Sequence, residues 1–140
     1  MNASAFSEAM NMSLGRLRAT KPLIWAGMLA SGLHFADNAL EIGQYPEPHW
    51  ITPFGVAVSW CMTTAIAVLA LTRKKADTLF VISGYAYALV LLSGLLHYAF
   101  GSVTQMSARS NSTVVAEALA GAALMVAMVV TSLSGNVNTD

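Results

Sequence analysis

Four runs of mainly apolar residues, each about as long as a membrane-spanning helix, restrict the fold of this chain more than any other feature. They cover residues 22–42, 52–72, 78–100 and 112–133, and short polar segments separate them. The hydrocarbon core of a bilayer is about 30 Å thick, which a helix of about 20 apolar residues crosses. The runs lack the alternation of polar and apolar residues that marks the strands of a membrane β-barrel. The sequence therefore predicts an all-α integral membrane protein with four transmembrane helices in an antiparallel bundle.

The overall composition agrees with a membrane protein and argues against two other classes. Only 10% of the 140 residues are charged, against roughly a quarter in a typical soluble domain. Seven Lys and Arg balance seven Asp and Glu, so there is no basic surplus with which to bind the phosphates of a nucleic acid. A single cysteine, Cys61, excludes an internal disulfide and a CxxC metal motif. We expect the lipid bilayer, and no nucleic acid, as a partner.

The chain divides into a leading segment of residues 1–21, a transmembrane domain of residues 22–133 and a tail of residues 134–140. Apolar side chains recur at helical spacing in the leading segment, at Phe6, Met10, Leu14 and Leu17. This stripe predicts a short helix that lies in the membrane interface, with an unstructured tail as the alternative. Pro22 is expected in the first turn of the first transmembrane helix, where its missing N–H costs no hydrogen bond.

The basic residues lie almost entirely on one side of the predicted membrane. Six of the seven precede the first run or join the second run to the third: Arg16, Arg18, Lys21, Arg73, Lys74 and Lys75. Only Arg109 falls on the other side. Cytoplasmic loops are enriched in Lys and Arg, so we expect both termini in the cytoplasm and a multi-pass location in the plasma (inner) membrane. Aromatic residues are expected to form a belt at the outer boundary: Tyr45, Trp50, Tyr98 and Phe100.

Polar and ionisable residues interrupt the apolar runs, and all of them fall in the outer half of the predicted membrane. They are His34, Asp37, Asn38 and Glu41 in the first run, His97 in the third and Glu117 in the fourth. The four in the first run are spaced i, i+3, i+4 and i+7, which puts them on one helical face. An ionisable residue inside a span costs about 2.5–3.5 kcal/mol on insertion scales and is a candidate functional residue by default. We therefore predict a polar site for a ligand or metal between the first, third and fourth helices, near the extracytoplasmic face.

A metal centre is one hypothesis for this site. Imidazole and carboxylate donors would suit Zn, Fe or Cu, and the ligands would come from His34, His97, Asp37, Glu117 and His49. His49 belongs to the loop of residues 43–50, whose two prolines limit its flexibility. Either His49 or Glu47 can fold back over the site from this loop. In the alternative interpretation, the loop anchors the chain at the interface through Trp50.

A ligand pocket with a proton relay is a second hypothesis, because a histidine beside a carboxylate can accept and return protons. The candidate ligand-binding and relay residues are Asp37, Asn38, Glu41 and Glu117.

Two further hypotheses remain open. His34 and His97 could serve as the axial ligands of haem b, although their estimated depths in the membrane differ by about 7 Å. The polar residues could instead join helices by hydrogen bonds. In that case the protein would be an accessory or scaffold subunit of a larger membrane complex, or a homo-oligomer.

Overall fold

The computed structural model describes the backbone of residues 3–136 and the side chains of residues 7, 11 and 14–133. Within these residues the structure is helical and contains no strand, which confirms the prediction of an all-α protein. The long helices are α1 (Ala3–Leu40), α2 (Pro53–Thr72), α3 (Thr78–Ser93) and α5 (Ala108–Asn136). Short helical turns follow α1 and α3: η1 (Ile42–Gln44), η2 (Gly94–Leu96), α4 (His97–Phe100) and η3 (Val103–Gln105).

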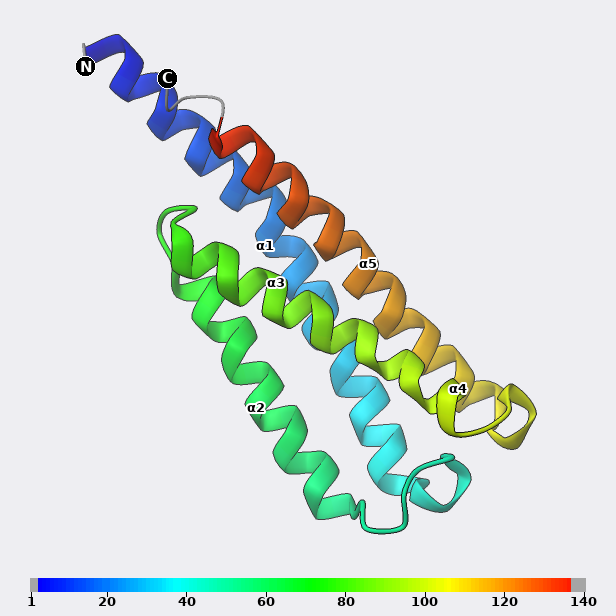
Figure 1. The fold of residues 1–140 in the computed structure, drawn as a ribbon. Helices are drawn as coiled ribbons and strands as arrows, with labels where there is room; N and C mark the ends of the chain where they lie inside the picture. Colours follow the sequence, from blue (N-terminus) through cyan, green and yellow to red (C-terminus); the bar gives the residue numbers. More distant parts are fainter. Residues whose placement is uncertain (1–2, 137–140) are drawn as a thin grey trace.

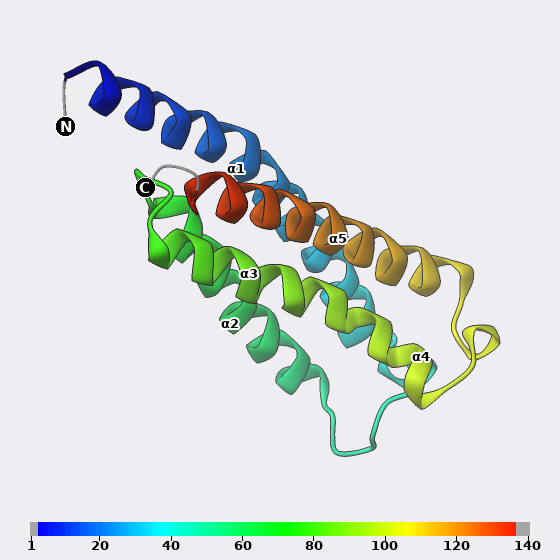
Figure 2. The ribbon, with the colours of Figure 1, turned by 45° about the horizontal axis from the view of Figure 1, so that its top comes forward.

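The long helices pack side by side, and each runs antiparallel to the one before it (Figure 1). Helix α1 packs against α2 and α5, and α3 packs against the same two helices. The start of α1 and the end of α5 therefore lie at one end of the molecule (Figures 1 and 2). The loop between α1 and α2 and the loop between α4 and α5 lie together at the opposite end.

Within the described residues, three segments are long and apolar enough to cross a membrane: Pro53–Thr72, Thr78–Phe100 and Ala108–Leu133. They agree with the second, third and fourth predicted spans. Helix α1 is long enough, but it is not among the three, because His34, Asp37 and Asn38 lower the mean hydropathy of its second half.

Helix α1 starts much earlier than predicted. It is continuous over 38 residues and contains Pro22 in its interior, so the predicted helix start at Pro22 is wrong. A proline inside a helix removes one hydrogen bond and crowds the preceding turn, yet α1 continues through Pro22, whose side chain is exposed. Of the predicted leading stripe, the side chains of Phe6 and Met10 lie outside the described residues, whereas Leu17 is buried.

Two helix starts have the residues that such positions favour. Thr52 precedes α2, and its side chain accepts a hydrogen bond from the Gly55 N–H, while Pro53 occupies the first helical position. Asp77 precedes α3 and accepts a hydrogen bond of 2.9 Å from the Phe80 N–H. These caps set the positions at which α2 and α3 enter the bundle.

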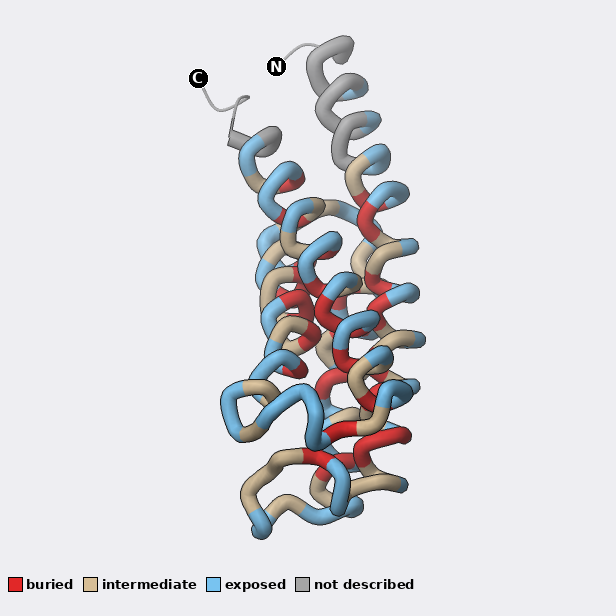
Figure 3. Tube along the Cα trace, turned by 90° about the vertical axis from the view of Figure 1, so that its right-hand side faces the viewer, coloured by how far each residue is buried: buried red, intermediate tan, exposed pale blue. Residues whose placement is uncertain are grey.

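The apolar core lies between the helices on the side nearer the chain ends, and the buried faces point inward along the whole bundle (Figure 3). Helices α3 and α5 come into direct backbone contact at Gly121. A Cβ atom placed there would lie 2.8 Å from the Leu91 Cβ and 3.0 Å from the Leu92 backbone nitrogen. Small residues permit such close approach between helices. At the opposite end of the bundle, buried polar side chains lie beside a small second apolar cluster formed by Tyr45, Met106 and Val114.

Candidate functional site

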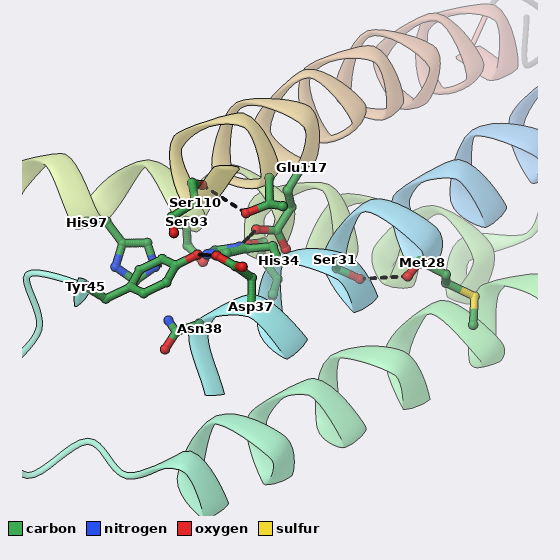
Figure 4. Close-up of polar contacts among 12 residues, drawn as sticks. Met28, Ser31, His34, Asp37, Asn38, Tyr45, Ser93, His97, Ser110 and Glu117 are labelled. Carbon is green, nitrogen blue, oxygen red and sulfur yellow. Dashed lines mark hydrogen bonds and ion pairs between the residues drawn. The ribbon is translucent and has the colours of Figure 1, made fainter. Parts of the chain in front are cut away.

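The centre of the polar end is a contact between two helices. His34 of α1 is 3% exposed and Glu117 of α5 is 1% exposed. The Nδ1 atom of His34 forms a hydrogen bond with Oε2 of Glu117 (Figure 4). The two helices pack along each other, so both side chains are buried at the same place. Each supplies the hydrogen-bond partner that the buried polar atom of the other requires.

A second histidine joins this pair from the segment that follows α3. The Nε2 atoms of His34 and His97 lie 3.2 Å apart, and their rings meet edge to face. The 3₁₀ turn η2 comes just before His97, and its first residue is Gly94. A Cβ atom at Gly94 would lie 2.7 Å from Oε2 of Glu117 and 3.3 Å from Cε1 of His34. Glycine therefore lets this segment approach closely enough for His97 to reach His34.

The loop between α1 and α2 supplies a fourth ionisable group. Oε1 of Glu47 lies 3.4 Å from Nδ1 of His97 and accepts a hydrogen bond from the side-chain amide of Asn38. The Tyr45 ring packs against the His97 ring with a centroid separation of 4.9 Å (Figure 4). The side chains thus form a continuous row in the order Glu117, His34, His97, Glu47, which we call the polar row.

A separate ion-pair cluster lies beside the polar row. The Arg109 Nε lies 2.6 Å from Oδ1 of Asp37, and its Nη2 lies 3.0 Å from Oε1 of Glu41. The Tyr45 hydroxyl donates a hydrogen bond of 2.8 Å to Oδ2 of Asp37. This cluster links the end of α1 to the start of α5 and holds Tyr45 against the polar row.

A cavity of about 270 Å³ adjoins the polar row. All four members of the row and Asn38 line it. Much of the remaining lining is apolar: Phe35, Ile51, Val56, Val90, Leu96 and Phe100. A mainly apolar cavity with a few converging polar groups is the usual form of a small-molecule site.

A groove of about 570 Å³ lies on the loop side of this cavity. Its lining comes from the loops that follow α1 and α4, and it shares Glu47, Pro48 and Phe100 with the cavity. Glu47 therefore stands between the two spaces.

The structure assembles part of the predicted set and distributes the rest. His34, His97 and Glu117 meet, as expected, and Asn38 lies beside them. Asp37 and Glu41 instead belong to the ion-pair cluster. His49 is exposed, and the neighbouring Glu47 occupies the place over the site.

Two participants, Arg109 and Tyr45, were missing from the predicted site, whereas Glu47 was one of the two loop residues predicted to fold back over it. Arg109 had a signal in the sequence, since it is the lone base on the side that carries most of the acids. Tyr45 was expected in an aromatic belt but is only 5% exposed, because its hydroxyl reaches Asp37 and its ring covers His97.

The geometry also bears on the metal and haem hypotheses. In the part of the chain that the structure describes, no group of three or more His, Cys, Asp and Glu side chains is placed to hold a metal ion. The carboxylates of Glu117 and Glu47 contact the Nδ1 atoms of the histidines. A haem iron between His34 and His97 would need their Nε2 atoms about 4 Å apart, at two metal–nitrogen bonds, with a macrocycle between them. The present 3.2 Å separation does not fit that arrangement.

The chain matches no protein-family model, no curated protein and no solved structure. The geometry and chemistry of the site are therefore the basis for its function.

The environment of Tyr45 leads to a testable result at alkaline pH. The pKa of the Tyr45 hydroxyl is raised from 10.0 to about 12, mainly by burial and also by the hydrogen bond that it donates to Asp37. A pKa that is higher in the folded state adds stability below pH 10, and this stability is lost as the pH rises toward 12. The phenolate absorbance in a wild-type minus Tyr45→Phe difference titration should therefore appear near pH 12. A difference signal complete by pH 10 would contradict the buried position of this ring.

Proposed function

We propose that the protein is a four-span membrane protein that binds a small ligand in the cavity and exchanges protons with it through the polar row. One observation carries this proposal: four ionisable side chains from two helices, the short helix α4 and a loop meet in an unbroken row along a cavity wall. A buried ionisable group in a membrane helix is costly unless it is used or paired, and here four are gathered at one place.

The first part of the proposal is that α1 is the fourth span. Its outward surface carries large apolar side chains that are more than half exposed: Trp25, Leu29, Leu33 and Leu40. Its polar residues His34, Asp37 and Asn38 are buried against the other helices. An apolar outer face and a polar inner face suit a helix that is surrounded by lipid on one side. At about 1.5 Å per residue, α1 is roughly 57 Å long, which is more than the thickness of the hydrocarbon core. The leading part of α1 would therefore extend beyond this core.

The second part is the orientation. Six of the seven basic residues fall near the end of the molecule that holds the chain ends, and only Arg109 falls near the polar row. The excess of bases favours the cytoplasm for that end. Under this orientation both termini are cytoplasmic in a plasma (inner) membrane, and the cavity and groove lie near the extracytoplasmic face.

The proton relay follows from counting protons in the row. Three contacts join its four groups: two hydrogen bonds and the 3.4 Å contact between Glu47 and His97. The relay assigns one proton to each contact. In one arrangement Glu117 is ionised, and it accepts from Nδ1 of His34. His97 donates from Nε2 to His34, and a protonated Glu47 donates to Nδ1 of His97. If each proton crosses its own contact, Glu117 becomes protonated and Glu47 ionised. The row keeps one negative charge, and one proton has in effect moved from the groove to the cavity wall.

Infrared titration of the carboxyl groups tests this coupling without any ligand. We would assign the protonated-carboxyl bands of Glu47 and Glu117 with Glu47→Gln and Glu117→Gln, in purified protein held in lipid nanodiscs. At a fixed pH, Glu117→Gln should change the intensity of the Glu47 band, because the two groups share the protons of one row. In a His97→Phe background the same replacement should leave the Glu47 band unchanged.

A matched control lies at the opposite end of the bundle. Asp77→Asn removes a carboxylate but keeps a residue that caps helices equally well, so it should leave both bands unchanged. If Glu117→Gln also leaves the Glu47 band unchanged in the otherwise wild-type protein, the relay does not exist. The polar row would then serve only to join helices, as expected of a scaffold subunit.

A further inference from the structure

The cavity beside the polar row contains an excess of buried hydrogen-bond acceptors. In the described part of the chain, five buried side-chain polar atoms have no hydrogen-bond partner, and three of them belong to residues that line this cavity. They are Oδ1 of Asn38, Oε2 of Glu47 and Oε1 of Glu117. Each of these side chains is more than nine-tenths buried. An unpaired buried polar atom costs about 1–3 kcal/mol, so a molecule that supplies three donors would remove a large penalty.

All three unpaired atoms are oxygens, and this defines the polarity of the missing partner. An oxygen of this kind accepts hydrogen bonds, and an ionised carboxylate can do nothing else. The histidine N–H groups are already engaged within the polar row. A ligand whose polar atoms only accept, such as a quinone or an anion, would therefore meet acceptors and negative charge.

The charge of the site points in the same direction. With the proton assignment proposed above, the polar row carries one negative charge. No Lys or Arg is among the residues that line the cavity in the described structure. Phe35 and Phe100 also line it, and the faces of aromatic rings attract cations. A monovalent cation would neutralise the row, whereas a second negative charge would be repelled.

We infer that the ligand of this cavity is a small protonated primary amine with an apolar body. This inference rests on the proposed function and specifies the class of molecule that the cavity takes. A primary ammonium has three N–H donors, which equals the number of unpaired oxygens. Its alkyl part suits the apolar lining provided by Val56, Val90 and Leu96. A metal ion fits less well, because the described residues offer no group of three or more ligands for it.

The groove offers such a cation a route from the loop side. It shares Glu47, Pro48 and Phe100 with the cavity, so a molecule that crosses between the two spaces passes the Glu47 carboxylate. Glu47 is thereby both the end of the polar row and a charged group at the entrance.

Calorimetric titration with butylammonium chloride tests the inference on the whole protein in nanodiscs. We expect saturable binding of butylammonium, and at least about tenfold weaker binding of 1-butanol and of butyrate, because a hydrogen bond to a charged group contributes about 1.5–3 kcal/mol. Glu117→Gln and Glu47→Gln should each weaken butylammonium binding by about tenfold or more on the same grounds. Asp77→Asn, which lies outside the cavity, should bind like the wild type.

Three results would overturn the inference: equal binding of butylammonium and 1-butanol, unchanged affinity in both glutamine variants, or stoichiometric binding of Zn²⁺ with no binding of butylammonium. The infrared experiment separates these failures from failure of the relay. Coupling of the Glu47 and Glu117 bands without butylammonium binding would leave the proposed function standing and remove the amine. Butylammonium binding without coupling would retain the amine site and remove the relay.

Discussion

Replacing His34 by leucine is expected to destabilise the folded protein by about 3–5 kcal/mol, because it leaves a buried carboxylate without the partner that compensates its charge. The abandoned partner is Glu117, which is 1% exposed and whose Oε2 is bound by His34. The free energy of unfolding is measured by titration with a denaturing detergent, with helix content followed by circular dichroism. This should be one of the two largest effects of any single replacement in the site.

The double variant His34→Leu/Glu117→Leu makes this result specific. Replacing both members of a buried pair by apolar residues is often neutral or stabilising, so the double variant should regain most of the lost free energy. The exposed pair formed by Arg73 and Asp77 provides a comparison. Its removal by Arg73→Gln should have little effect, as for most surface ion pairs. If the two leucine replacements cost as much together as the sum of their separate effects, His34 and Glu117 are not coupled.

Replacing Gly121 by valine is the second replacement with a large expected effect. A Cβ atom at this position would lie 2.8 Å from the Leu91 Cβ and 3.1 Å from the Ala88 carbonyl oxygen. Backbone atoms cannot rotate away as the end of a side chain can, so α3 and α5 must separate. Overpacking of this kind costs about 1–3 kcal/mol and occasionally more. The same detergent titration measures it, and Gly121→Ala should cost less than Gly121→Val.

Gly15 of α1 is the matched control for this packing effect. No atom lies within 4 Å of a Cβ placed there, and glycine in a helix interior is about 0.5–1 kcal/mol less favourable than alanine. Gly15→Ala should therefore stabilise the protein slightly or leave it unchanged. If alanine destabilises the protein equally at positions 15 and 121, then Gly121 is not required for the close approach of α3 and α5.

The positions of the helices could be predicted well from the sequence, because their apolar runs are long and the polar segments between them are short. The start of α1 could not. Pro22 is a reliable helix start only where something else prevents the helix from extending backward, and here the preceding residues continue the helix to Ala3. The change from α-helix to 3₁₀ helix at Gly94 could not be predicted either, since an apolar run is compatible with both backbone conformations.

The site could be predicted only in part, for a related reason. Helical spacing identified His34 as facing inward, and the cost of burying charge identified Glu117. Counting residues from an expected helix end puts the two histidines about 7 Å apart in depth, which does not anticipate the 3.2 Å between their Nε2 atoms. A depth counted along the backbone leaves out how far each side chain reaches. The choice between Glu47 and His49 depends on the path of an irregular loop, which has no periodicity to read.

The 3₁₀ turn at Gly94–Leu96 also changes the direction, around the helix axis, in which the following side chains point. Each residue of a 3₁₀ helix turns the chain by about 120° instead of about 100°, so three residues advance the helix by roughly 60° beyond the α-helical phase. His97 therefore points in a different direction around the helix axis from the one that it would have if α3 continued as an unbroken α-helix. Leu95 is 43% exposed, so many side chains would fit at that position, whereas a single insertion would turn His97 away. A distant relative with the same site should therefore keep the spacing Gly-x-x-His more strictly than the identity of residue 95.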